Sequence, residues 1–173
     1  MDASGYLYSM ATVGMSFAGL SVLTMILGQM LGGQQMNKFD GFVARSWVQL
    51  GFMITLGSIL PPLLGLFDAS TLMVWRISSG LMAIILGWWA LTFPRRRHAV
   101  KATPLPIPVI AFCVAMDLVA LALAANAFVV PVERLPGVYA ASVTAILLGA
   151  GMLFLFAFVH WYEALLGHEK PEP

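Results

Sequence analysis

The chain has 173 residues, of which 60% are hydrophobic and only 10% are charged, and its formal net charge at pH 7 is +1. Soluble domains carry about a quarter of charged residues, and a mean hydropathy of +0.89 also lies outside their range. These values exclude a soluble globular protein, and the low net charge argues against nucleic acid as a partner. We therefore expect the lipid bilayer to be the main environment of the chain.

Five long apolar stretches fill most of the sequence. Each holds about twenty residues or more, which is enough for a helix to cross about 30 Å of hydrocarbon. Stretches of this length and continuity exclude transmembrane strands. They run over Tyr8–Leu31, Trp47–Phe67, Leu72–Phe93, Pro108–Val130 and Val138–Leu166. The sequence thus predicts an all-α polytopic membrane protein with five transmembrane helices in a single domain over residues 1–173.

Prolines and the N-terminal residues add detail to these stretches. Pro61 and Pro62 near the end of the second stretch are expected to kink or terminate its helix. Pro104, Pro106 and Pro108 predict a stiff, extended lead into the fourth helix. The first nine residues contain an acid and no basic residue, so we expect no cleaved signal peptide.

Basic residues predict the orientation of the five spans. Seven of the nine lie in three segments that an odd number of spans places on one side of the membrane. These seven are Lys38, Arg45, Arg95, Arg96, Arg97, Lys101 and Lys170, whereas Arg76 and Arg134 lie toward the other side. The positive-inside rule then predicts an outside N-terminus and a cytoplasmic C-terminus, and we expect a bacterial inner membrane.

Aromatic residues near the predicted helix ends agree with this orientation if they form interfacial belts. The outer belt would contain Tyr6, Tyr8, Trp75 and Tyr139, and the inner belt would contain Trp47, Trp88, Trp89, Trp161 and Tyr162.

Three of the predicted helices carry small residues along one face. Such faces let neighbouring backbones approach closely, so they indicate helix packing within one chain or between copies. The three stripes are Gly14, Ala18, Ser21, Gly28 and Gly32; Arg76, Gly80, Ala83, Gly87 and Ala90; and Ser142, Ala145, Gly149, Phe156, His160 and Glu163. The second stripe predicts that Arg76 shares a face that packs inward.

One acid, Asp117, lies in the middle of the fourth stretch. Cys113, Ala120 and Ala124 share its face, whereas Asn126 lies nine residues on and points to the opposite side. A carboxylate at the bilayer centre is expensive unless it is paired, hydrated or protonated. The position of Asp117 therefore indicates either a role in ion or proton transport, or a structural hydrogen bond to a neighbouring helix.

The depth of each side chain suggests which groups meet Asp117. Arg76 is expected about 11 Å nearer the outer surface, so we predict that it is a rim charge near outer acids or headgroups. His160 is expected within about 4 Å of the depth of Asp117, and Glu163 lies one turn below it. The three residues predict an ion or proton pathway to the inner surface. The alternative makes His160 and Glu163 interfacial residues beside Trp161.

The remaining motifs narrow the chemistry. Arg95, Arg96 and Arg97 are typical of an anchor for anionic lipids, with a specific phosphate site as the alternative. Gln49 is a further polar candidate in the second helix. The single Cys113 rules out a disulfide framework, and no hydrolase, nucleotide-binding or metal-binding motif is present. We expect no cofactor, no metal and no enzymatic activity. The alternative is an intramembrane enzyme that uses Asp117 and His160 as an acid–base pair.

Together these observations favour a small inner-membrane protein that forms a homo-oligomeric channel or carrier for protons or small ions, with Asp117 at its centre. The alternative is a non-catalytic accessory or assembly subunit of a larger membrane complex, whose small-residue faces dock onto other membrane subunits.

Overall fold

The computed structural model describes residues 3–32, 38–100 and 107–167, without the side chains of residues 3–4, 28–29, 31–32, 40, 157 and 160–167. Within these ranges the chain forms five long helices, which confirms the predicted class. They are α1 (Ala3–Gly32), α2 (Lys38–Gly65), α3 (Thr71–Ala99), α4 (Ile107–Phe128) and α5 (Leu135–Gly167), with a short 3₁₀ turn η1 (Val132–Arg134) before α5. All five are long and apolar enough to cross a membrane.

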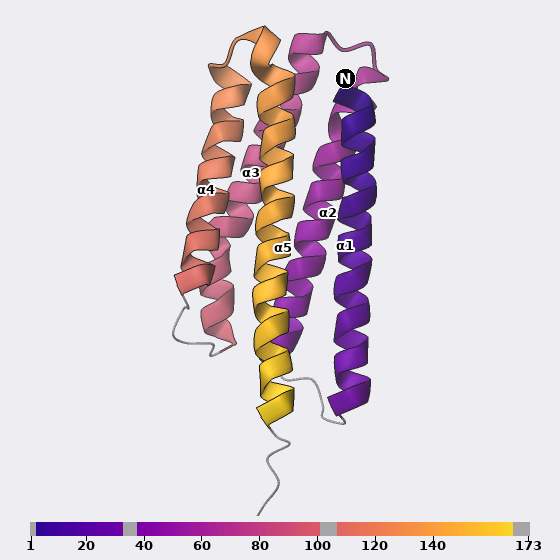
Figure 1. The fold of residues 1–173 in the computed structure, drawn as a ribbon. Coiled ribbons are helices and arrows are strands. Elements are labelled where there is room, and N and C mark those ends of the chain that lie inside the picture. The colour runs from indigo at the N-terminus through magenta and orange to yellow at the C-terminus, as the bar shows by residue number, and fades with distance from the viewer. Residues whose placement is uncertain (1–2, 33–37, 101–106, 168–173) are drawn as a thin grey trace, which may run out of the picture.

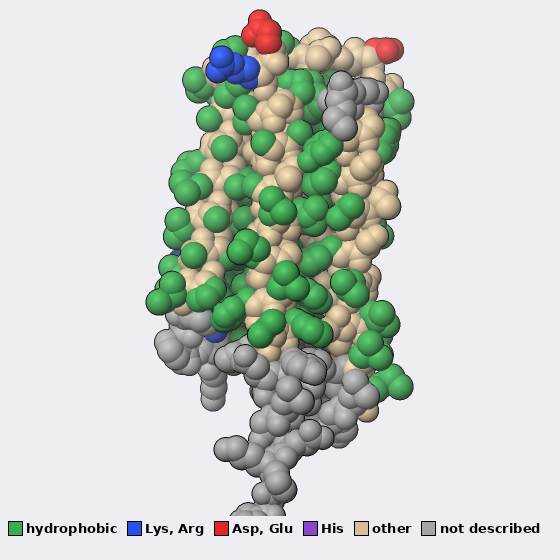
Figure 2. Space-filling model, viewed as in Figure 1, with side chains coloured by type: hydrophobic (Ala, Val, Ile, Leu, Met, Phe, Trp, Pro, Cys, Tyr) green, Lys and Arg blue, Asp and Glu red, His purple; other side chains and the backbone are tan. Residues whose placement is uncertain are grey.

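The helices alternate in direction along one common axis (Figure 1). Helices α1 and α2 form one close pair and α3 and α4 form another, while α5 contacts all four of them. The C-terminal ends of α1, α3 and α5 therefore lie together at the lower end in Figure 1. Lys38, the first residue of α2, and the arginine run in the last turns of α3 belong to the same end. On the face shown in Figure 2, the coloured side chains along the flank are almost all hydrophobic, and acidic side chains are visible only at the upper end.

Helix α2 continues through Pro61 and Pro62 to Gly65, so of the two expected effects of these prolines, a kink or termination, the structure contradicts termination. A proline at position i removes the N–H that would bond the carbonyl of residue i−4, which here affects Gly57 and Ser58. Tyr139 of α5 compensates for one of these losses, because its hydroxyl donates a 2.6 Å hydrogen bond to the Gly57 carbonyl. A buried donor on a neighbouring helix thus satisfies the backbone that a proline leaves open.

The α1–α2 contact is built from small residues. A Cβ on Gly51 would lie 2.7 Å from the Ala18 Cβ and 2.9 Å from the Gly14 carbonyl. A Cβ on Gly14 would lie 2.9 Å from the Ile54 side chain. The described part of the first small-residue stripe therefore packs inside the chain, and the backbones approach closely only because these side chains are absent.

The stripes on α3 and α5 also face neighbours within the chain over part of their length. Gly80 and Gly87 lie opposite Ala127 and Ala120 of α4, and Gly149 lies against Met116 and Phe112. Arg76 is nevertheless exposed, so the expectation that it packs inward was wrong. It lies in the second turn of α3, above the level at which Gly80 meets the end of α4.

A polar contact that the sequence reasoning missed joins three helices at the upper end. Asn126 of α4 is fully buried, and its Nδ2 donates to Ser79 Oγ of α3 at 2.8 Å. The same nitrogen donates to the carbonyl of Leu135, the first residue of α5, at 3.1 Å. The sequence places Asn126 on the side of α4 opposite Asp117, and in the structure Asn126 is buried in the core.

Several residues assigned to the aromatic belts lie in the core instead. Tyr139 is fully buried, and Trp75, Trp47 and Trp89 are each at most 9% exposed. Tyr139 and Trp75 pack edge to face with their ring centroids 5.7 Å apart. A belt residue contacts the headgroups, whereas these four side chains are covered by their own chain. Tyr8 and Trp88 are exposed.

Candidate functional site

Asp117 lies midway along α4 and is half-buried. Its neighbours Met116 and Ala120 are buried, whereas Leu118 and Leu121 are more than 60% exposed. The carboxyl group therefore sits at the border between the packed face of α4 and its outward face. Among the side chains that the structure describes, none forms a hydrogen bond or an ion pair with it.

The α3–α4 register shows what lies level with Asp117. Gly80 is opposite Ala127 and Gly87 is opposite Ala120, so the antiparallel pair places Asp117 level with Ala90. The buried Arg97 lies seven residues further down α3, about 10 Å along the axis. Cys113, one turn below Asp117, is within electrostatic range of both charged groups.

The position of His160 relative to Asp117 differs from the sequence expectation. Gly149 of α5 lies against Phe112 and Met116 of α4, and His160 is eleven residues beyond it toward the lower end. That register separates the Asp117 and His160 backbones by about 20 Å along the axis, because α5 continues well past the start of α4 (Figure 1). The side chains of His160 and Glu163 lie outside the described residues.

Arg76 and the arginine run occupy different environments. Arg76 is exposed near the upper end of α3, and the register puts it about 20 Å above Asp117, so the two do not pair. At the lower end Arg95 is exposed, Arg96 is half-buried and Arg97 is only 7% exposed. Arg97 lies with its guanidinium carbon 5.3 Å from the centroid of the Phe39 ring.

Arg96 joins α3 to α2 through Gln49, which the sequence indicated only as a further polar candidate in the second helix. Its Nη1 donates to Gln49 Oε1 at 3.0 Å, and its Nη2 donates to the Trp89 carbonyl at 2.9 Å. Trp89 Nε1 donates to the same Gln49 oxygen at 3.1 Å. This cluster is a polar crosslink near the lower end of α2 and α3.

The centre of the bundle is filled by apolar side chains. The fully buried ones include Leu50, Ile54, Met82, Leu86, Met116, Leu123, Val143 and Ile146. Of the two cavities described, one is lined by residues of α1, α2 and α3 and the other by residues of α2 and α3, and Asp117 lines neither. A route past Asp117 would therefore follow the outside of α4 rather than the axis of one chain.

No candidate metal site of three or more His, Cys, Asp or Glu side chains occurs among the described residues. Comparison of the chain with protein-family models, with curated proteins and with solved structures gave no match.

Proposed function

We propose that this chain is an integral membrane protein of the bacterial inner membrane, with its N-terminus outside and its C-terminus in the cytoplasm. The length and apolarity of the five helices support insertion. The grouping of Lys38, Arg45 and the arginine run at one end supports the orientation. The aromatic residues lend this orientation little support, because several of them are core residues.

We further propose that copies of the chain assemble and pass protons or small ions along the α4 surface that carries Asp117. The observation that carries this proposal is the half-buried carboxyl group in the middle of α4, which has no partner among the described side chains. In hydrocarbon such a group must be protonated, or it must be paired with a polar group of another molecule. Because the core of one chain is filled, a second copy placed against α4 supplies both the partner and the second wall of a path.

The direct test is reconstitution of the purified chain into vesicles at increasing protein density. A path formed between copies predicts flux of protons or monovalent cations that rises more steeply than linearly with density, because assembly is concentration-dependent. Flux that stays linear down to densities at which the chain is monomeric would contradict a path between copies. A lack of flux at every density would contradict transport.

The second candidate is an accessory subunit, and the same unpartnered carboxyl group on the surface of α4 supports it, because a different chain can bind there. In that case a group of a different chain forms a hydrogen bond or an ion pair with the Asp117 carboxyl group, and no ion is transported. The mass and composition of the particle extracted in mild detergent separates the two readings. Multiples of one chain support transport, whereas stoichiometric unrelated chains support the accessory role.

A further inference from the structure

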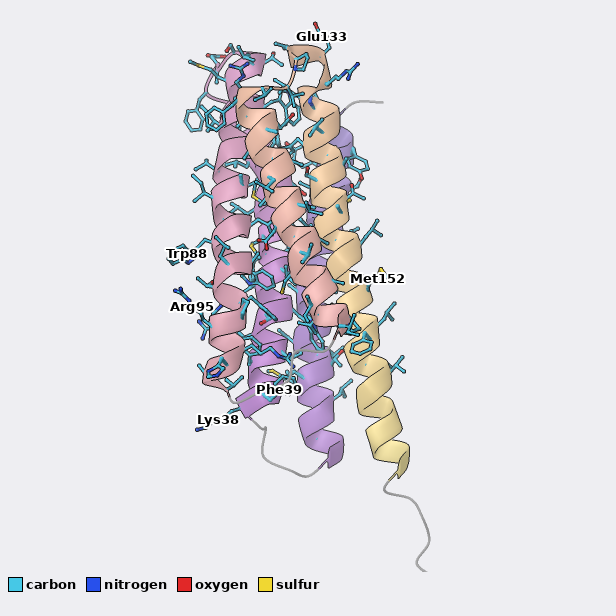
Figure 3. All side chains as sticks on the ribbon, turned by 90° about the vertical axis from the view of Figure 1, so that its left-hand side faces the viewer. Lys38, Phe39, Trp88, Arg95, Glu133 and Met152 are labelled. Atoms are coloured by element: carbon cyan, nitrogen blue, oxygen red, sulfur yellow. The ribbon has the colours of Figure 1, made fainter. Side chains whose placement is uncertain are left out.

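A groove between α2 and α3 opens on the flank of the bundle, near the end that carries the arginines. Its volume is about 390 Å³. The lining residues are Gln49, Phe52 and Met53 of α2 and Ile85, Trp88, Trp89, Thr92 and Arg96 of α3. Phe52 and Trp88 are 55% and 72% exposed, so the groove is accessible from the surroundings of the bundle. Trp88 points outward from α3, with Arg95 below it (Figure 3).

The lower end of the groove is cationic. Two N–H groups of Arg96 are bonded, one to the Gln49 side-chain oxygen and one to the Trp89 carbonyl, and both acceptors are neutral. No described carboxylate pairs with Arg96, and the positive charge of Arg45 acts on it as well. These bonds hold the guanidinium in place while leaving part of its fork of five donors for a further acceptor.

The rest of the groove is apolar. Ile85 is eleven residues above Arg96 on α3, which corresponds to about 16 Å along the helix. Met53 and Phe52 form the opposite wall. The groove therefore has a cationic head region near the end of the bundle and an apolar channel that extends toward its middle, which is the polarity of a membrane lipid.

We propose that this groove binds one anionic phospholipid, with its phosphate at Arg96 and an acyl chain along Ile85 and Met53. An arginine fork bonds phosphate oxygens in pairs. A net negative lipid is favoured over a zwitterionic one, because no described carboxylate offsets the charge of Arg96 and the choline cation would be repelled. Anionic lipids also populate the cytoplasmic leaflet. The inference rests on the proposed membrane insertion and orientation, but it does not depend on ion passage. Its failure is therefore distinguishable from the failure of transport.

Native mass spectrometry of the full chain released from neutral detergent tests the proposal. The lipids are phosphatidylglycerol and phosphatidylcholine with identical acyl chains, and inorganic phosphate is added in a separate sample. Wild type should retain one phosphatidylglycerol, and Arg96→Gln should reduce that retention by about tenfold, the loss expected for a charge-assisted bond. The matched control is Arg134→Gln, which removes the same charge at an exposed position at the opposite end of the bundle and should retain wild-type binding.

Equal losses in the two arginine variants would overturn the proposal, because they would show a general charge effect. Equal retention of phosphatidylcholine, or full displacement of the lipid by inorganic phosphate, would also overturn it. If Arg96→Gln does not fold, Ile85→Trp decides the question, because it fills the apolar end without changing any charge. A folded Ile85→Trp protein that retains phosphatidylglycerol like wild type would refute the proposal, and a loss in that variant would support it.

Discussion

The hydrogen bond between Tyr139 and the Gly57 carbonyl should stabilise the bundle because Pro61 has no N–H with which to bond that carbonyl. Tyr139→Phe removes the only hydroxyl bonded to it among the described residues and leaves a buried acceptor unsatisfied. Interhelical hydrogen bonds in membrane bundles average about 0.6 kcal/mol, but an orphaned buried group costs about 1–3 kcal/mol. We therefore expect Tyr139→Phe to lower the free energy of unfolding by about 1–2 kcal/mol.

Restoring the backbone donor should remove most of this effect. In Pro61→Ala the N–H of residue 61 can bond the Gly57 carbonyl as in any helix, so Tyr139→Phe in that background should cost less than about 0.5 kcal/mol. The resulting coupling is about 1 kcal/mol. Any cavity left by Pro61→Ala is common to both sides of the cycle and cancels.

The assay is reversible unfolding of the four proteins in mixed micelles, followed by far-UV circular dichroism. Additive effects of Tyr139→Phe and Pro61→Ala on the free energy of unfolding would refute the reasoning, because the Gly57 carbonyl would then not be the group that couples the two positions. A Tyr139→Phe protein as stable as wild type would refute it as well.

Three further predictions concern the fold and its orientation. Gly51→Ala should destabilise the bundle by about 1–2 kcal/mol in the same assay, because its Cβ would clash with α1 backbone atoms. The control Gly19→Ala, whose Cβ would lie in open space, should be neutral or stabilising by up to about 1 kcal/mol. Equal effects of the two substitutions would contradict the close α1–α2 packing. Asn126→Leu should lower stability by about 1–2 kcal/mol through loss of two interhelical bonds, and no loss of stability would contradict its role. In a cysteine-free background, a membrane-impermeant maleimide should label Asp68→Cys in intact cells and Arg95→Cys only after permeabilisation; the reverse pattern would overturn the orientation.

The existence of the five helices was predictable because a long apolar run has few other physical solutions. The helix ends were less predictable. Helix α2 begins at Lys38, well before Trp47, and α3 continues past Pro94 to Ala99. Apolarity marks the part of a helix that suits hydrocarbon, whereas polar residues extend the same helix beyond it. In α3 the basic residues of the last turn also interact favourably with the helix C-terminus.

The contacts of polar and aromatic residues could not be predicted from composition along one helix. Tyr139 and Trp75 are amphipathic, so their positions near helix ends fit a belt and a core equally well. The sequence signal for the Tyr139 contact is the pair of prolines Pro61 and Pro62, because they leave two carbonyls that need a donor from another helix. For His160 the depth estimate was wrong because it was measured from the end of an apolar run, whereas α5 extends beyond α4.

The measurement that tests the central claim most directly is proton or cation flux into vesicles containing wild type, Asp117→Asn or Glu133→Gln. The last variant makes the same carboxylate-to-amide change at an exposed position at the end of the bundle. Asp117→Asn should reduce flux by at least about tenfold, because the amide can neither carry a proton nor bear the charge that attracts a cation, while Glu133→Gln should retain wild-type flux. A folded Asp117→Asn protein that transports as fast as wild type would contradict the role of Asp117.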